Sequence, residues 1–228
     1  MNGDHVAGAA SPWRSALALG LVAMIGTALL AGVNQLTRER IEAQERRSVL
    51  EQLEQLVGAE RYDNAMHEDQ ISLQGVAGFA TGQEITVYRA RMAGEPVAVI
   101  MKLTTDEGYN GRIGLLVAVN ADGSVSGVRV TSHKETPGLG DGIELPKSDW
   151  ILGFNGRSLL HPAPAGWAVK RDGGVFDQFT GATITPRAVV DAVRNCLEYF
   201  SAHRDALFHT PPATGMTSDR KHLERNVG

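Results

Sequence analysis

The chain has almost no cysteine. Cys196 is the only one among 228 residues. A single thiol cannot form an internal disulfide, a CxxC redox pair, a haem attachment site or the ligand set of an iron–sulfur cluster. Any electron transfer by this chain must therefore use an organic cofactor. Cys196 itself lies among apolar positions of an expected helix, so we expect it to be a small buried hydrophobic residue.

The chain also lacks a large excess of charge of either sign. Lys and Arg total 22 and Asp and Glu total 26, for a net charge of -4. This balance argues against nucleic acid as a partner. The sequence contains no GxGxxG after an expected strand, no nucleophile elbow and no paired carboxylates in a catalytic context. We therefore expect no catalytic residue. We also expect no metal site, because His133 has no acidic or thiol partner at ligand spacing.

One long hydrophobic run is present. Residues 15–33 carry no charge and approach the length of about 20 residues that crosses a bilayer. A cleaved signal peptide is the alternative, with Arg14 before the run and small residues near its end. The run is longer than a usual signal core and continues without a breaker into a helical pattern. We therefore expect a short tail over 1–14 and a retained anchor over 15–36.

The charges around this run predict an orientation. Arg14 precedes it, whereas Arg38, Arg40, Arg46 and Arg47 follow it. Because cytoplasmic flanks carry an excess of Lys and Arg, this count alone places the following domain in the cytoplasm.

A connecting helix over 37–58 follows, and Gly58 is a plausible end for it. Its expected apolar positions are Val49, Leu53, Leu56 and Val57. Residues 61–82 give only weak signals. Alternating or β-rich patterns then predict strands at 84–91, 96–104, 113–120 and 125–132, with two further short strands at 167–170 and 175–179. The Asp-Gly within 121–124 predicts a β-hairpin.

The last expected element is a helix, with Thr185 as its N-cap and Pro186 at its first position. Its apolar face comprises Val189, Ala192, Val193, Cys196, Leu197 and Phe200. The polar, proline-containing stretch 209–228 is expected to be a mobile tail. This order of elements predicts an α+β domain over 59–208, with an antiparallel sheet packed by helices.

The stretch from Asp177 to Thr183 reads DQFTGAT. It combines a strand end, a turn at Gly181 and a hydroxyl just before a helix. Gly181 and Ala182 leave room for a bulky group near the backbone. Free N–H groups and the helix dipole, worth about 0.3–1 kcal/mol, would favour a phosphate on Thr183. From the residues alone, a capping turn remains the simpler interpretation.

DQFTGAT resembles the flavinylation motif D-x-x-[ST]-G-A-T of the FMN-binding domain family. In that family a flavin transferase moves FMN from FAD onto the last threonine of the motif. The resemblance therefore implies FMN bound covalently, through its phosphate, to Thr183. Asp177, Thr180, Gly181 and Ala182 match the other positions of the motif.

Two further stretches resemble the RnfG family, whose members are components of the ion-translocating oxidoreductase complex Rnf, also called Rsx. The resemblance extends over residues 13–208. They are GYNGRI around Tyr109 and HKETPGLGDGIE over 133–144. Alone, the second stretch is typical of a constrained surface loop. The resemblance places it near the flavin ring, where Glu135 and Thr136 would hydrogen-bond the ring edges. Trp150 and Phe154 are candidates for packing on the ring, although ordinary core packing is favoured for both.

The resemblance implies an electron-carrying subunit that does not turn over a substrate by itself. Its partners would be the other subunits of a complex that couples electron transfer to ion movement, and a flavin transferase during maturation. The resemblance implies that the flavin domain lies on the periplasmic side of the inner membrane. The arginine count around the hydrophobic run predicts the opposite orientation. The flavinylated component of the sodium-translocating NADH:quinone oxidoreductase, a membrane-tethered FMN redox sensor and a structural domain without cofactor remain alternatives.

Overall fold

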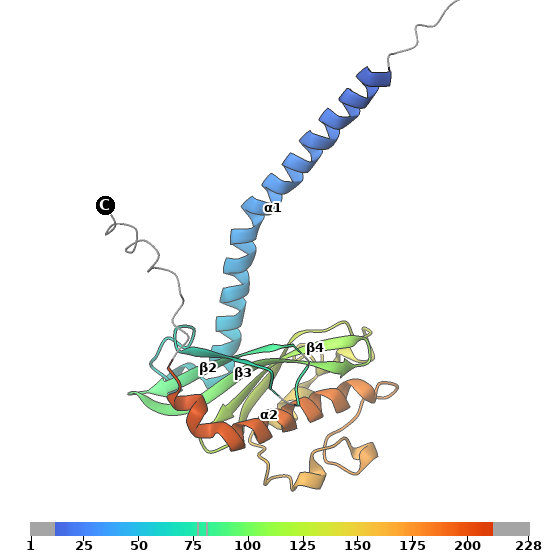
Figure 1. The fold of residues 1–228 in the computed structure, drawn as a ribbon. Coiled ribbons are helices and arrows are strands. Elements are labelled where there is room, and N and C mark those ends of the chain that lie inside the picture. The colour runs from blue at the N-terminus through green and yellow to red at the C-terminus, as the bar shows by residue number, and fades with distance from the viewer. Residues whose placement is uncertain (1–11, 77, 81, 212–228) are drawn as a thin grey trace, which may run out of the picture. The chain divides into compact units, whose positions relative to one another are not determined.

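The computed structural model describes residues 12–76, 78–80 and 82–211. The chain divides into two compact units, Met1–Leu50 and Glu51–Gly228. Most of the expected tails, 1–14 and 209–228, lies outside the described residues. Helix α1 spans Pro12–Val57 (Figure 1), and the N–H of the next residue, Gly58, donates to the carbonyl of Glu54 at 2.8 Å.

The first half of α1 exposes its large apolar side chains. They comprise Trp13, Leu17, Leu19, Leu21, Val22, Met24, Ile25, Leu29 and Leu30. Judged on the described residues alone, none of the helices combines the length and the hydropathy of a membrane span.

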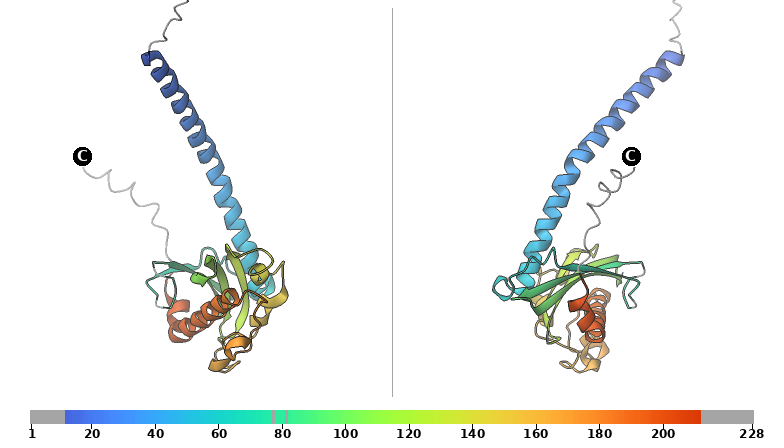
Figure 2. Two further views of the ribbon diagram at one scale, coloured as in Figure 1. Left: turned by 90° about the vertical axis from the view of Figure 1, so that its right-hand side faces the viewer. Right: turned by 60° about the vertical axis from the view of Figure 1, so that its left-hand side comes forward.

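The second unit is built on a five-stranded antiparallel sheet whose strands follow one another in chain order. They are β1 (Gln70–Gln74), β2 (Glu84–Met92), β3 (Glu95–Gly108), β4 (Gly111–Asn120) and β5 (Val125–Ser132). Helix α2 (Ile184–His209) packs against β3 and β4 on one face of this sheet (Figure 2). The α+β fold expected from the sequence is confirmed.

Both faces of the central strands are buried. Side chains alternate across a strand, so the odd-numbered residues of β4, such as Leu115 and Val117, share a core with α2. The even-numbered Leu116 is buried on the opposite face, as are Leu53 and Leu56 near the end of α1. Leu53, Leu56 and Val57, three of the apolar positions expected for the connecting helix, are buried, whereas the side chain of Val49 lies outside the described residues.

The four main strands agree with the expected ones, and the hairpin turn over 121–124 is confirmed, with Gly123 at a φ of +87°. β1 was not expected, because it lies within residues 61–82, whose sequence signals are weak. Its five residues pair only with β2. The two short strands expected at 167–170 and 175–179 were wrong. A single bridge between Val169 and Phe176 joins these segments, and the remainder forms turns and a 3-10 helix, η5 (Lys170–Asp172).

The start of α2 also differs from the expectation. The helix begins at Ile184, and Thr183 already has helical backbone angles, φ -83° and ψ -29°. Pro186 therefore lies at the third helical position, which tolerates its missing N–H equally well because the first turn has no intrahelical acceptors. Thr185 is not the N-cap, since its side chain points into the protein.

The single cysteine is buried against the sheet, as expected. Cys196 is fully enclosed, with its Sγ 3.8 Å from the Sδ of Met101. Burial in this apolar environment raises the pKa of the thiol. A thiol that stays protonated is a poor nucleophile and a poor metal ligand, so Cys196 contributes packing rather than chemistry.

Candidate functional site

A cavity of about 240 Å³ opens at the start of α2. It lies where the β3–β4 turn, the loop after β5 and the first residues of α2 meet. Its lining comprises Tyr109, Glu135, Thr136, Leu139, Gly140, Gly181, Ala182, Thr183, Ile184 and Thr185. Ligand pockets usually measure about 300–1,000 Å³, so this cavity suits part of a cofactor whose remainder lies in solvent.

The DQFTGAT stretch forms a tight turn that ends on the lip of the cavity. The N–H of Ala182 donates to the carbonyl of Phe179 at 3.1 Å, and Gly181 has a φ of +80°. That conformation suits the third position of a type II turn and favours glycine. The indole N–H of Trp150 donates to the carbonyl of Asp177 at 2.7 Å and holds the start of the turn.

Thr183 is half-buried between this turn and the helix. Its carbonyl accepts the N–H of Arg187 at 3.3 Å, the first hydrogen bond of the helix. The N–H groups of Ile184 and Thr185 precede that bond and have no intrahelical acceptor. The Thr183 hydroxyl makes no capping bond. Its Oγ1 instead accepts from Nη1 of Arg171 at 3.5 Å, the outer limit of a hydrogen bond. This hydroxyl is therefore available for modification.

Glu135 is the buried carboxylate of the site. One oxygen accepts the backbone N–H of Asn110 at 3.0 Å, and the other accepts the hydroxyl of Thr185 at 2.5 Å. Any side chain at Gly108 or Gly140 would meet these oxygens, since an added Cβ would lie 2.9 Å from one of them in each case. The carboxylate thus joins the β3–β4 turn, its own loop and the start of α2.

His133 stabilises the same loop through both of its ring nitrogens. Its Nδ1 accepts the N–H of Glu135 at 3.0 Å, so the proton of the neutral ring belongs on Nε2. Nε2 lies 2.6 Å from the carboxylate of Glu144 and donates to it. Within the described part of the chain, no group of three or more His, Cys, Asp or Glu side chains could hold a metal ion.

The remaining expected site residues lie around the cavity rather than together inside it. Thr136 is exposed at the rim, where its hydroxyl accepts the side-chain amide of Asn110 at 3.3 Å. Asp177 is exposed and pairs with Lys170 at 2.6 Å. Thr180 is exposed on the turn and does not line the cavity.

Trp150 and Phe154 lie away from the cavity and inside an aromatic cluster. Phe154 is fully buried and stacks on Phe176, with ring centroids 4.6 Å apart, and on Trp167 at 6.3 Å. Trp150 packs edge-on against Phe154 and Phe179. The core packing favoured for both residues is therefore what the structure contains.

Sequence reasoning did not single out the apolar rim of the cavity. Tyr109, Leu139 and Ile184 are large apolar residues that stay exposed beside Thr183. Two of them lie within stretches that carry the family resemblance, GYNGRI and HKETPGLGDGIE, which is the only signal that could have identified them. Exposed apolar side chains at the mouth of a cavity are typical of a binding site.

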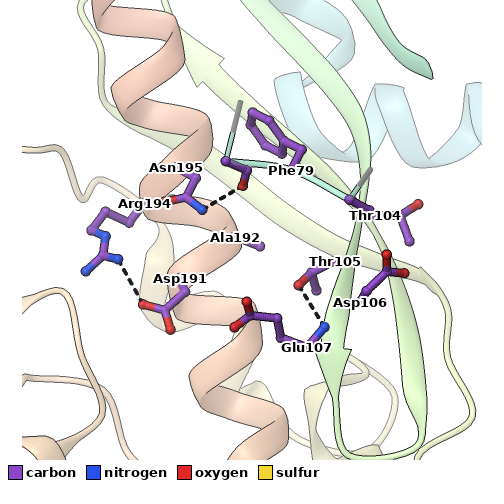
Figure 3. A pocket seen from close by; sticks show the side chains of 11 residues that line it. Phe79, Thr104, Thr105, Asp106, Glu107, Asp191, Ala192, Arg194 and Asn195 are labelled. Atoms are coloured by element: carbon purple, nitrogen blue, oxygen red, sulfur yellow. Dashed lines mark hydrogen bonds and ion pairs between the residues drawn. The ribbon is translucent and has the colours of Figure 1, made fainter. Parts of the chain in front are cut away.

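A larger cavity of about 450 Å³ lies farther along α2, between its middle turns and the end of β3 (Figure 3). Asp106, Glu107 and Asp191 face it, and the last forms an ion pair with Arg194 at 3.2 Å. Burial, reinforced by Glu107, raises the pKa of the Asp191 carboxyl, while Arg194 opposes the shift. An acidic lining repels phosphate. The cavity beside Thr183 is therefore the better candidate for a phosphate-containing cofactor, although its volume is smaller.

Comparison with known proteins adds the family. Residues 108–198 match the model of the FMN-binding domain, and residues 1–56 match the RnfG N-terminal region. A protein of Shewanella loihica, named as the G component of an ion-translocating oxidoreductase complex, is 48% identical over 87% of this chain and 93% of its own length. Proteins of the same name from Pseudomonas aeruginosa (48% identity; 89% and 94%) and Cereibacter sphaeroides (47%; 89% and 90%) are similar throughout.

Proposed function

This chain belongs to the RnfG family of ion-translocating oxidoreductase complexes, and we propose that it carries electrons in such a complex through FMN esterified to Thr183. One observation carries the proposal. The DQFTGAT turn presents the Thr183 hydroxyl, without a capping role, on the lip of a cavity at a helix start. The FMN, when bound, supplies the redox chemistry, and the chain supplies attachment and position.

The residues around the hydroxyl fit an FMN phosphate. The N–H groups of Ile184 and Thr185 and the positive end of the helix dipole favour an anion there. Gly181 and Ala182 add almost no bulk beside the attachment point. Asp177 holds the neighbouring turn through Lys170. These contacts support an ester on Thr183, with Thr180 as part of the turn that presents it.

The rest of the cavity suits a flat, largely apolar ring. The exposed Tyr109, Leu139 and Ile184 supply apolar surface, and the hydroxyl of Thr136 supplies a polar contact at the rim. Glu135 acts in a different way from the ring contact that we expected. Both of its oxygens already accept protein donors, so we propose that it holds the walls of the cavity together.

The attachment itself is expected to be a transfer by a flavin transferase. The Thr183 oxygen bonds to the flavin-side phosphorus of FAD, the bond to AMP breaks and the hydroxyl proton is released. A covalent bond suits a small open cavity, because FMN held by non-covalent contacts alone would dissociate easily. It also fixes the distance to the neighbouring electron carriers, which other subunits of the complex would contribute.

The mass of the intact protein tests this function. Protein purified from its native membrane is expected to exceed its sequence mass by one FMN less one water. Peptide mapping is expected to place the increment on the peptide that contains Thr183. An unmodified mass in protein from cells that contain the flavin transferase would refute the electron-carrier proposal.

The N-terminal part of the chain is proposed to anchor the domain in the inner membrane. We propose a short tail over 1–14, a span over 15–36, a connecting helix over 37–58, the FMN-binding domain over 59–208 and a tail over 209–228. The uncharged run and the exposed apolar side chains on α1 support this division.

The FMN-binding domain is proposed to face the periplasm, although the arginines after the span favour the other orientation. Fusing alkaline phosphatase after Gly228 is expected to yield active enzyme, because this reporter folds only after export. A fluorescent reporter that matures only in the cytoplasm is the matched control and is expected to stay dark. The opposite pair of results would place the domain in the cytoplasm.

The relatives favour the Rnf complex over the alternatives. The proteins from Shewanella loihica, Pseudomonas aeruginosa and Cereibacter sphaeroides all carry the same name, whereas the flavinylated component of the sodium-translocating NADH:quinone oxidoreductase would belong to a different complex. A tethered redox sensor would act without either complex. Purification of the chain with integral membrane subunits and iron–sulfur proteins would distinguish the proposed complex from a sensor.

A further inference from the structure

The η5 turn lies directly beside the DQFTGAT stretch and is attached both to it and to α2. Lys170 pairs with Asp177 at 2.6 Å, and the N–H of Arg171 donates to the side chain of Gln178 at 3.3 Å. Asp172 accepts two hydrogen bonds from Arg187 of α2, at 2.7 and 3.1 Å. These contacts fix the position of the turn relative to the start of α2.

The cations of this surface are not equivalent. Lys170 and Arg187 each have a carboxylate partner, and the hydrogen bond from Arg187 lowers the pKa of Asp172. Among the ion pairs of the described residues, Arg171 takes part in none, and its charge only adds to the effect of Arg187 on the pKa of Asp172. Its guanidinium instead donates to the uncharged hydroxyl of Thr183, at 3.5 Å. A guanidinium binds an anion far more strongly than it binds a neutral hydroxyl. The guanidinium of Arg171 could therefore bind an anion at this position.

We propose that Arg171 binds the phosphoryl group of the Thr183 ester and assists its formation. This inference rests on the proposed attachment of FMN to Thr183. When the Thr183 oxygen bonds to the flavin-side phosphorus of FAD and AMP leaves, negative charge concentrates on the oxygens of that phosphorus. A guanidinium already held beside the hydroxyl stabilises this charge, and it remains the counter-ion of the resulting diester.

Arg171 is a positioning residue for the transfer, because the flavin transferase performs the chemistry. The contacts of its turn explain why it can act in this way. Lys170, Asp172 and the backbone of Arg171 hold the turn, so the guanidinium does not have to contribute to stability. Removing the head group is therefore expected to affect the modification without unfolding the domain.

The rate of flavin transfer tests this role. The full-length apo chain, in detergent, would be incubated with FAD and a flavin transferase, and modification followed by in-gel fluorescence and intact mass. Arg171→Gln is expected to slow the initial rate by about 10- to 100-fold, less than the loss of a donor in an enclosed oxyanion hole, because Arg171 is exposed to solvent. Arg171→Lys is expected to recover much of the rate, because it restores the charge but not the planar fork.

Arg112→Gln is the matched control. Arg112 is also exposed and lies on the same domain, but its partner is Asp106. It is expected to leave the rate unchanged. Salt should slow the wild-type reaction more than that of Arg171→Gln, since only the former contains the screened attraction. A rate for Arg171→Gln equal to that of wild type would overturn this inference alone, whereas failure of the wild-type chain to accept FMN would overturn the proposed function and this inference with it.

Discussion

Thr183→Ala is expected to abolish covalent flavin fluorescence in a denaturing gel. The Thr183 hydroxyl is the proposed nucleophile, and alanine has no oxygen to form the ester. Its side chain makes no capping bond, so its removal should leave the helix start intact. The loss should therefore be complete in the gel, while the free energy of unfolding changes by less than about 1 kcal/mol.

Two variants serve as controls for this experiment. Thr183→Ser keeps a hydroxyl at the same backbone position and is expected to retain fluorescence. Thr180→Ala removes the other hydroxyl of the motif, which is exposed and does not line the cavity. It is expected to reduce the yield without eliminating it. Fluorescence that persists in Thr183→Ala would mean that the flavin is attached elsewhere.

Glu135→Ala is expected to lower the free energy of unfolding by about 1–3 kcal/mol. The substitution leaves the N–H of Asn110 and the buried hydroxyl of Thr185 without their acceptor. The unsatisfied buried hydroxyl of Thr185 costs about 1–3 kcal/mol, whereas Asn110 is exposed and water can replace its lost acceptor. The lost contacts also join the β3–β4 turn to the start of α2, so the same variant is expected to accept FMN more slowly.

Urea unfolding followed by tryptophan fluorescence would measure the loss, since Trp150 and Trp167 both lie in this domain. Glu135→Gln is the milder comparison, because its amide can still accept from Asn110 or from Thr185. Thr185→Val removes the hydroxyl alone. A double-mutant cycle between Glu135→Ala and Thr185→Val should show a coupling of about 1–3 kcal/mol. Simple additivity would mean that the hydrogen bond between these two side chains contributes little.

Much of the sheet could be predicted from local patterns. Alternation and the Asp-Gly turn identified β2 to β5, because side-chain period and turn conformation depend only on neighbouring residues. β1 was missed because it is short and pairs on one side only. The stretch 167–179 resembled two strands, but it packs as turns around Trp167 and Phe176, which contact each other and the distant Phe154.

The start of α2 illustrates a conflict that the sequence could not resolve. A hydroxyl before a proline is a common N-cap pattern, so Thr185 was the natural choice. In the structure that hydroxyl is buried and donates to Glu135, a residue 50 positions earlier. The buried carboxylate requires a donor, and this requirement outweighs a cap that other residues or water can replace. The helix consequently begins earlier and places Thr183 at its start.

The sequence by itself determined the α+β class, the expected helix after the sheet and, through DQFTGAT, the threonine proposed to carry FMN. These properties depend on residues that are adjacent or a few positions apart. Only the tertiary structure decided that Glu135 holds three segments together, that Tyr109, Leu139 and Ile184 share one rim, and that Arg171 faces Thr183. The physical reason is that these residues come from separate elements, and their proximity depends on how the chain packs rather than on any local pattern.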